Sequence, residues 1–169
     1  MRSRVITFPD ADGLRPTPDR VRQTLFNWLG QTLYGRSCLD LFAGSGALGF
    51  EAASRGADRV TMVENNPRVC HALQDNMRKL ALTSISVHRQ DGLEFVSRDP
   101  QRYDVIFLDP PFQSDYLPRL FELLPARLTE HGVLYVEAGN TICPPDIWQT
   151  VKSGKAGQVH YQLLRVKND

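Results

Sequence analysis

The sequence predicts one α/β domain built around a mostly parallel sheet of seven strands, with an antiparallel hairpin at its C-terminal end. From Ser37 onward, short apolar runs alternate with stretches of helical periodicity, which is the pattern of a parallel sheet with crossover helices. The last two apolar runs are joined by a connection too short for a crossover, so they must pair antiparallel. The length of 169 residues suits one domain with one core.

The first 36 residues are predicted to form an arm and a helix that pack on the main domain, residues 37–169. Up to about residue 14 the chain is polar and lacks clear periodicity, which indicates an irregular arm. A helix is predicted from about 18 to 33, with Thr17 as its N-cap and Pro18 in its first turn. Its apolar face would consist of Val21, Leu25, Phe26, Trp28 and Leu29.

The rest of the chain is predicted to supply the sheet and its covering helices. The predicted parallel strands are 38–42, 59–64, 85–88, 103–108 and 132–137. The predicted helices are 46–55, 67–81, 91–97 and 115–127. Residues 147–153 and 157–166 are predicted to form the hairpin, with Gly-Lys-Ala-Gly at 154–157 as its turn.

Charge, cysteine and hydropathy patterns limit the possible function classes. The net charge is only +1, but residues 1–36 contain six arginines against three aspartates, which suits a polyanionic partner or a solvated helix face. Cys38, Cys70 and Cys143 form no C-x-x-C pair, which favours a reducing compartment and, for the first two, buried packing. The histidines lack zinc-ligand spacing, so no metal is expected. Without a signal peptide or membrane span, a soluble cytoplasmic protein is expected.

A glycine-rich turn follows the first predicted strand. Between Leu39 and Gly49, an apolar strand runs into a turn and then into a helix. Gly44 and Gly46 permit a tight turn and bring the backbone close to a ligand, while Gly49 lets the helix pack near the sheet. Open α/β sheets bind ligands at this carboxyl edge of their strands.

Acidic residues after the next two strands favour a nucleoside as the ligand. Glu64 ends the second strand and can accept hydrogen bonds from ribose hydroxyls. Because Gly44 to Gly49 also match G-x-G-x-x-G, a dinucleotide cofactor is an alternative at this point. Asp91, after the third strand, can accept from an adenine amino group or simply cap the next helix. The candidate cofactor-binding residues are Asp40, Gly44, Gly46, Glu64, Asp91 and Gly92.

The deciding feature is the sequence Asp109-Pro110-Pro111-Phe112, which follows the fourth apolar strand. Two prolines end the strand abruptly and stiffen the loop after it. That stiffness would hold the Asp109 carboxylate and the Pro110 carbonyl as two hydrogen-bond acceptors at the open edge of the sheet. Phe112 would place a flat apolar surface beside them.

This set of residues suits methyl transfer to an exocyclic amino group of a base. Such a nitrogen is a poor nucleophile because its lone pair is delocalised into the ring. Two acceptors bonded to its two hydrogens would pull it toward tetrahedral geometry and aim the lone pair at the methyl group of a sulfonium donor. Phe112 would stack on the base. The proton can leave to Asp109 or to water, because the product ammonium is acidic.

With these motifs the chain resembles the RsmD family of 16S ribosomal RNA guanine-N2 methyltransferases. The resemblance lies in segments 15–29, 39–56, 109–112 and 156–159; Gln23 stands where the family has glutamate, and Met1 to Thr7 show no glycine-containing arm. It implies a Rossmann-like methyltransferase fold, S-adenosylmethionine as donor, and a guanine of small-subunit 16S rRNA, within a partly assembled particle, as acceptor. Asp109, Pro110 and Phe112 would then handle the base. The residues placed near the cofactor or RNA entrance are Arg15, Thr17 and Arg20.

Two other classes of function stay open from the residues alone. One is a methyltransferase for adenine N6 in DNA or for a protein glutamine, because an amide nitrogen poses the same lone-pair problem. Asparagine commonly replaces the leading aspartate in those groups, so Asp109 argues modestly against them. The other is a nicotinamide-dependent oxidoreductase, in which the Asp-Pro-Pro-Phe loop would have no role, or a catalytically silent nucleotide-binding module.

Overall fold

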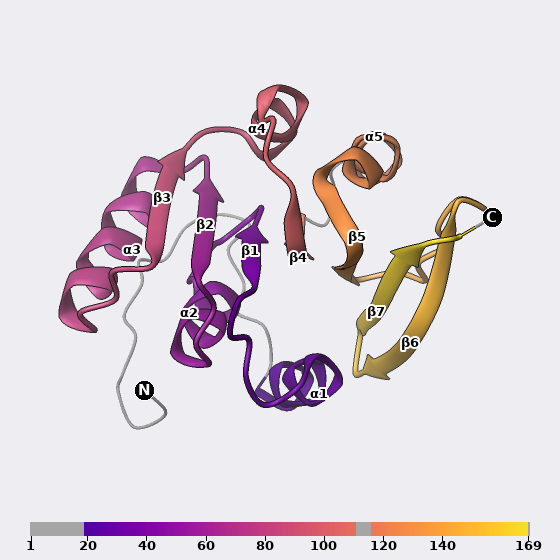
Figure 1. Ribbon diagram of the computed structural model, residues 1–169, viewed down its shortest axis with the longest axis horizontal. Coiled ribbons are helices and arrows are strands. Elements are labelled where there is room, and N and C mark those ends of the chain that lie inside the picture. The colour runs from indigo at the N-terminus through magenta and orange to yellow at the C-terminus, as the bar shows by residue number, and fades with distance from the viewer. Residues whose placement is uncertain (1–18, 111–115, 169) are drawn as a thin grey trace.

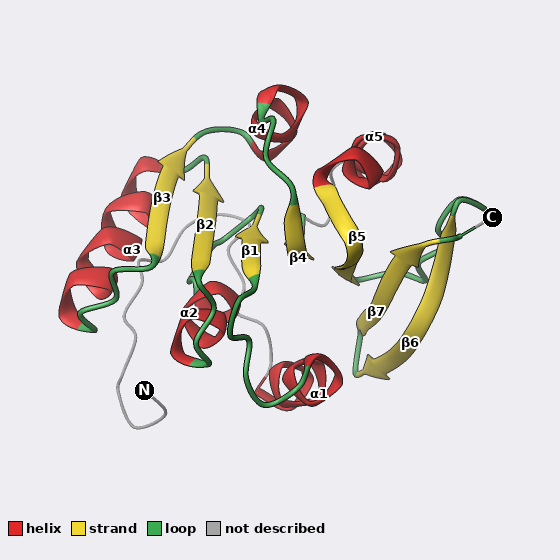
Figure 2. Ribbon diagram, in the orientation of Figure 1, coloured by secondary structure: helices red, strands yellow, loops and turns green. Residues whose placement is uncertain are grey.

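The computed structural model describes residues 19–110 and 116–168, which build one seven-stranded sheet between two layers of helices (Figures 1 and 2). The strands are β1 (Ser37–Asp40), β2 (Arg59–Glu64), β3 (Ile85–Arg89), β4 (Tyr103–Leu108), β5 (Leu128–Ala138), β6 (Trp148–Ala156) and β7 (Val159–Val166). Their order in the sheet is β3-β2-β1-β4-β5-β7-β6. The first five run parallel and β7 lies antiparallel between β5 and β6, so the predicted fold class is confirmed.

The helices divide the apolar core into two clusters, one on each face of the sheet. One face is covered by α1 (Asp19–Leu29), α2 (Ala47–Ser54) and α3 (Pro67–Lys79). The other is covered by α4 (Gly92–Arg98), α5 (Tyr116–Leu123) and a 3₁₀ helix, Leu124–Arg127. In Figure 1, α1 and α2 lie below the strands and α3 lies at the left beside β3, whereas α4 and α5 lie above the strands. Strands buried on both faces are expected where helices cross over a parallel sheet.

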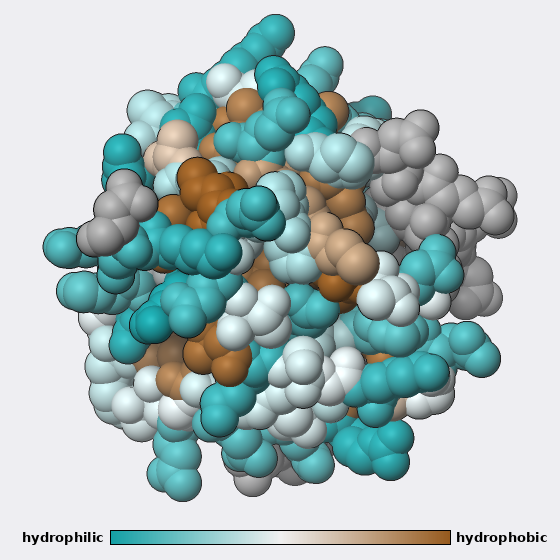
Figure 3. All heavy atoms as spheres, turned by 90° about the vertical axis from the view of Figure 1, so that its right-hand side faces the viewer, coloured by the Kyte–Doolittle hydropathy of each residue, from teal (hydrophilic) through white to brown (hydrophobic). Residues whose placement is uncertain are grey.

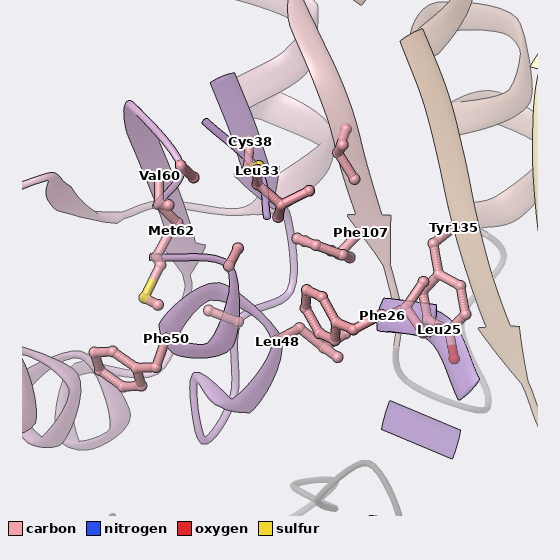
Figure 4. Packing of buried hydrophobic residues seen from close by; sticks show 14 of the residues in the cluster. Leu25, Phe26, Leu33, Cys38, Leu48, Phe50, Val60, Met62, Phe107 and Tyr135 are labelled. Atoms are coloured by element: carbon pink, nitrogen blue, oxygen red, sulfur yellow. The ribbon is translucent and has the colours of Figure 1, made fainter. Parts of the chain in front are cut away.

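Helix α1 is packed on the sheet beside the ends of β4 and β5. Figure 4 shows Phe26 of α1 next to Phe107 of β4 and Tyr135 of β5. The ring centroids of Phe26 and Phe107 are 5.9 Å apart, and both residues are completely buried. Burying one such ring stabilises a fold by about 1.5–3 kcal/mol. The helix is therefore held against the edge of the sheet where the predicted ligand site lies.

Several predicted element bounds are wrong for local reasons. Helix α1 ends at Leu29, not at 33, because Gly30 adopts a left-handed φ of 106°. The N–H of Gly30 donates the last hydrogen bond of the helix, to the carbonyl of Phe26. The predicted helix 115–127 divides into α5 and the 3₁₀ helix around Pro125. The predicted arm, Thr17 and Pro18 lie outside the described residues.

Strand β5 begins at Leu128, four residues before the predicted start, and strand β1 ends at Asp40, two before the predicted end. The extra part of β5 pairs Leu128 with Tyr103, across an irregularity of register before Val105 meets Val133. An interrupted pairing of this kind leaves no regular alternation in the sequence, so the pattern alone misses it.

The hairpin turn is also shorter than predicted, because Gly154 and Lys155 belong to β6. A Cβ atom on Gly154 would lie 2.6 Å from Cζ of Tyr161, whose ring covers this glycine from β7. The actual turn is at Gly157, which has a φ of 60°. Strand β6 is the edge of the sheet and is largely exposed; on this side of the molecule Figure 3 shows hydrophobic residues as separate patches among polar ones.

Candidate functional site

The turn after β1 has the tight geometry that its glycines predict. Gly44 and Gly46 adopt left-handed φ values of 54° and 82°. The N–H of Gly46 donates to the carbonyl of Ala43 at 2.8 Å, and the N–H of Ala43 donates to Val63 at the end of β2 at 3.0 Å. The turn is thus fastened to the neighbouring strand, and a residue with a Cβ would be strained at either glycine.

Gly46 and Gly49 are needed for close packing inside the protein. A Cβ on Gly49 would come within 2.3 Å of Cε of Met62, so the prediction that Gly49 lets α2 approach the sheet is confirmed. A Cβ on Gly46 would come within 2.5 Å of the Phe50 ring and 2.6 Å of Leu73. The sequence predicted that the missing side chain of Gly46 would leave space for a ligand. In the structure, Phe50 and Leu73 of the protein's own core fill that space.

Glu64 joins the glycine turn to the loop after β2. One carboxylate oxygen accepts the N–H of Gly44 at 3.0 Å, and the other accepts the N–H of Asn66 at 2.9 Å. Asn66 in turn caps α3 through its side chain. Each carboxylate oxygen has a second lone pair, so the fixed carboxylate can still accept hydrogen bonds from neighbouring hydroxyls.

Asp40 lies behind the glycine turn and is almost completely buried. Its carboxylate accepts the N–H of Gly49 at 3.1 Å, which ties the end of β1 to the first turns of α2. Burial raises the pKa of Asp40 to about 7, and the nearby charge of Glu64 adds to this, while the Gly49 hydrogen bond acts in the opposite direction. Its hydrogen bond is with the helix that follows the turn, and whether Asp40 also binds a ligand stays a prediction.

Asp91 caps helix α4, as one of its two predicted roles requires. One carboxylate oxygen accepts the N–H of Glu94 at 3.2 Å, and the other accepts the Tyr116 hydroxyl at 2.8 Å. This hydrogen bond is the largest cause of the raised pKa of Tyr116. The Tyr116 ring stacks on Phe42, with centroids 5.6 Å apart, which brings the start of α5 to the turn after β1. Capping leaves acceptor capacity on the carboxylate, so its predicted role toward adenine remains open.

Gly92 permits close packing beside the same turn. A Cβ atom there would lie 2.9 Å from the Phe42 ring and 3.0 Å from the carbonyl oxygen of Leu41. Gly92 is buried, so the structure gives it a packing role next to the site.

Asp109 and Pro110 directly follow β4, which lies beside β1 in the sheet. Asp109 is half-buried and Pro110 is buried. The ends of these two parallel strands meet at one edge, so Asp109, Pro110 and the glycine turn are brought to the same side of the molecule. Pro111 and Phe112 lie outside the described residues, as do Arg15 and Thr17 of the predicted entrance; Arg20 is exposed at the start of α1.

Three side chains at this edge were not found from the sequence: Tyr116, Tyr135 and Glu137. The Tyr135 hydroxyl donates to the carboxylate of Glu137 at 2.8 Å, and both residues are completely buried. Glu137 comes near the end of an apolar strand, as Glu64 does, and this shared pattern is a signal that could have identified it. The Tyr116–Asp91 contact spans 25 residues and has no local signal.

Other features add no further site in the described part of the chain. Cys38 and Cys70 are buried, as predicted; burial raises the pKa of the Cys38 thiol to about 12, and the Cys70 thiol donates to the carbonyl of Glu64. Among residues 19–110 and 116–168, no three histidine, cysteine or acidic residues are grouped so that they could hold a metal ion. No helix of this part has the length and apolarity needed to cross a membrane.

Comparisons with known proteins return one family over nearly the whole chain. The family described as "Conserved hypothetical protein 95" matches residues 1–165. The chain is 38% identical, over 97% of its length and 85% of the relative, to "Ribosomal RNA small subunit methyltransferase D" of Escherichia coli (strain K12). It is 39% identical, over 97% of its length and 89% of the relative, to the protein of the same name from Haemophilus influenzae.

A solved structure agrees with these sequence matches. The structure described as "Putative methyltransferase yhhF from Escherichia coli" superposes with a TM-score of 0.85 at 36% identity, covering 96% of this chain and 92% of that one. The similarity therefore includes the sheet, its helices and the edge at which the candidate residues gather.

Proposed function

Because the chain belongs to the "Conserved hypothetical protein 95" family, the RsmD family of ribosomal RNA methyltransferases, we propose that it methylates the exocyclic N2 of a guanine in 16S rRNA. The methyl donor is S-adenosylmethionine, as the methyltransferase fold and the methyltransferase relatives indicate. The proposed substrate is the rRNA of the small subunit or of an assembly intermediate, and the proposed location is therefore the cytoplasm. The family, the methyltransferase activity on rRNA and the donor predicted from the sequence all agree with the comparisons.

The observation that carries the proposal is that two candidate segments meet at one edge of the sheet. The glycine turn follows β1, and Asp109 and Pro110 follow β4; these strands are parallel neighbours in which Asp40 and Phe107 are paired. A donor held at the glycine turn would lie beside an acceptor base held at Asp109 and Pro110. This adjacency is what direct transfer between two bound molecules requires.

We propose that the glycine turn after β1 binds the donor. Glu64 would accept the ribose hydroxyls, since backbone N–H groups already fix its carboxylate. Asp91 would accept the adenine amino group, and Gly44 and Gly46 would shape the turn. Asp40 and Gly92 would support this pocket from behind. S-adenosylmethionine, when bound, supplies an electrophilic methyl group on a sulfonium.

We propose that Asp109 and Pro110 activate the amino group of the guanine. The Asp109 carboxylate and the Pro110 carbonyl would each accept one amino hydrogen, which localises the nitrogen lone pair and directs it at the methyl group. Phe112 would stack on the base, which must be turned out of any helix to reach it. Asp109 or water would take the proton.

The N-terminal segment is proposed to serve RNA docking within the same structural domain. Arg15, Thr17 and Arg20 would line the entrance near the cofactor or the RNA. Helix α1 supports this arrangement because Val21, Leu25 and Phe26 are completely buried in the core that residues 37–169 also form. Residues 1–36 would then act as part of the catalytic domain.

Transfer of labelled methyl groups to small-subunit particles tests the proposal. Particles from a strain lacking this activity would be incubated with labelled S-adenosylmethionine and the protein, and rRNA and ribosomal proteins would then be counted separately. We expect label in the rRNA and its loss with Asp109→Ala, at unchanged donor binding. Label in the ribosomal proteins instead of the rRNA would exclude the proposal. Tight binding of NAD without binding of S-adenosylmethionine would also exclude it. A wild-type rate of methylation by Asp109→Ala would exclude the proposed mechanism.

A further inference from the structure

Glu137 is a buried carboxylate near the end of β5, at the edge of the sheet that holds the candidate site. It is completely buried, and its neighbours on this face of the sheet are aromatic. Moving a carboxylate out of water is costly, and a glutamine or an apolar side chain of similar size would avoid that cost. An ionisable group kept in such a place is typical of a functional site.

The register of the sheet places Glu137 beside Asp109. Phe107 is paired with Tyr135 and Leu108 with Val136, so the next residues along the two strands are Asp109 and Glu137. Side chains alternate between the faces of a strand, so Glu137 returns to the α1 face that holds Tyr135 and Phe107. Figure 4 shows Tyr135 and Phe107 side by side on that face.

Tyr135 is hydrogen-bonded to Glu137 and lies in the electrostatic field of Asp109. Its hydroxyl donates to Glu137 at 2.8 Å, and the pKa of Tyr135 is raised, first by burial and then by the charges of Glu137 and Asp109. The hydroxyl therefore remains a donor, and it lies within electrostatic range of both acids.

Glu137 is also confined on its far side. Tyr161 of β7 is paired directly opposite Glu137, and the Tyr161 ring stacks on Trp28 of α1 at 5.3 Å. Gly154 of β6 leaves the space that this ring occupies. The aromatic wall and the Tyr135 hydrogen bond hold the carboxylate near the end of β4, where Asp109 lies.

We propose that Glu137, held by Tyr135, is a positioning residue that keeps a second negative charge next to Asp109 to favour methyl transfer. This inference rests on the proposed function. As the nitrogen lone pair forms the bond to the methyl carbon, the carbon–sulfur bond breaks and its electron pair stays on sulfur. The amino nitrogen becomes positive until its proton leaves to Asp109 or to water. A fixed buried carboxylate stabilises that developing positive charge more than one in water does.

The test compares Glu137→Gln with Glu130→Gln, the same substitution at an exposed position of β5. Glutamine keeps the shape of Glu137 and a carbonyl oxygen that accepts from Tyr135, but it removes the charge. We expect Glu137→Gln to lower kcat by roughly 10- to 100-fold. KM for the particle and the affinity for S-adenosylmethionine should stay near those of the wild type, and the unfolding midpoint should stay at or above it. Glu130→Gln should be like the wild type in all four.

Two further variants keep the proposal testable if Glu137→Gln does not fold. Glu137→Asp retains the charge and should recover part of the lost kcat, whereas Tyr135→Phe releases the carboxylate and should lower kcat less than charge removal does. The inference is overturned if Glu137→Gln keeps the wild-type kcat. It is also overturned if the activity lost in Tyr135→Phe is fully explained by a smaller fraction of folded protein. If the wild-type protein itself methylates no rRNA, the proposed function fails; if it does and the variants match it, only this inference fails.

Discussion

Single carboxylates at the sheet edge differ in role because their surroundings differ. Glu64 is half-buried and its oxygens are fixed by the N–H groups of Gly44 and Asn66, so the carboxylate is oriented before any ligand arrives. Asp40 is buried behind the turn and bonds Gly49. The first arrangement suits ligand binding, and the second suits support of the turn.

Replacing Glu64 by glutamine should weaken donor binding. The amide loses the charge-assisted hydrogen bonds to ribose hydroxyls and presents an NH₂ group to backbone N–H donors, so we expect the Kd for S-adenosylmethionine to rise about 10- to 100-fold. Calorimetric titration measures this. Glu122→Gln, at an exposed position of α5, is the matched control. An unchanged Kd in Glu64→Gln would show that the carboxylate does not touch the donor.

Replacing Asp40 by asparagine should change how stability depends on pH. The folded-state pKa of about 7 is above the ordinary 3.8, so the stability that protonated Asp40 contributes is complete below about pH 4 and is lost as pH rises through 7. Between pH 5 and 8 the wild type should lose about 3 kcal/mol more unfolding free energy than Asp40→Asn. Urea unfolding of the apo proteins at both pH values measures this difference. Parallel losses would contradict the raised pKa.

At the residue scale, the sequence predicted candidates better than it predicted contacts. Glu64, Asp91 and Asp109 could be identified because each follows an apolar strand, and the ends of parallel strands meet at one edge of a sheet. The Tyr116 hydroxyl on Asp91 and the Tyr135 hydroxyl near Asp109 could not, because those contacts depend on how α5 and β5 pack. Local patterns carry no information on such distant pairs.

At the scale of elements, the turn between β1 and α2 depends on both backbone conformation and space. Gly46 has a φ of 82° and lies against Phe50 and Leu73, whereas Gly35 has a similar φ of 77° with open space around its Cβ position. The two glycines therefore separate the cost of the left-handed backbone from the cost of crowding.

Alanine at these two positions should have different effects. Gly35→Ala should destabilise the fold by about 1–2 kcal/mol, the cost of a left-handed backbone with a side chain. Gly46→Ala should cost about 2–5 kcal/mol, because overpacking against Phe50 and Leu73 is added. Urea unfolding at one pH measures both. Equal losses of unfolding free energy in the two variants would contradict this, because they would mean that Phe50 and Leu73 can move aside at no cost.

The element bounds show which signals are readable in a sequence. Strands β2 and β4 have the bounds that were predicted, because each is a mainly apolar run, interrupted once by Thr61 or Asp104, with polar residues on both sides. Helix α1 stops early at Gly30, since a glycine in a left-handed conformation ends a helix that apolar spacing would continue. The start of β5 depends on pairing across an irregular register, which only the neighbouring strand determines.

At the scale of the whole molecule, the fold class was predictable because alternation of apolar runs and helices determines it, and the family comparisons agree. Within residues 19–110 and 116–168 a single sheet with its helices includes every element, and no separate RNA-binding unit accompanies them. We therefore expect recognition of RNA by the shape of a larger target.

Assembled particles should therefore be better substrates than short RNA. We expect kcat/KM on small-subunit particles to exceed that on a bare stem-loop of the same sequence by about tenfold or more, since a few added contacts suffice for this. Steady-state methylation of both substrates in one buffer gives the ratio. Equal values on the two substrates would contradict recognition by shape.

The identity of the methylated nucleoside tests the central proposal most directly. Particles from a deficient strain would be treated with the protein and S-adenosylmethionine carrying a deuterated methyl group, and the rRNA would be digested and analysed by mass spectrometry. The proposed amino-group chemistry at Asp109 predicts the label in N2-methylguanosine of the small-subunit rRNA. Label in N6-methyladenosine or in a ribosomal protein glutamine would contradict it.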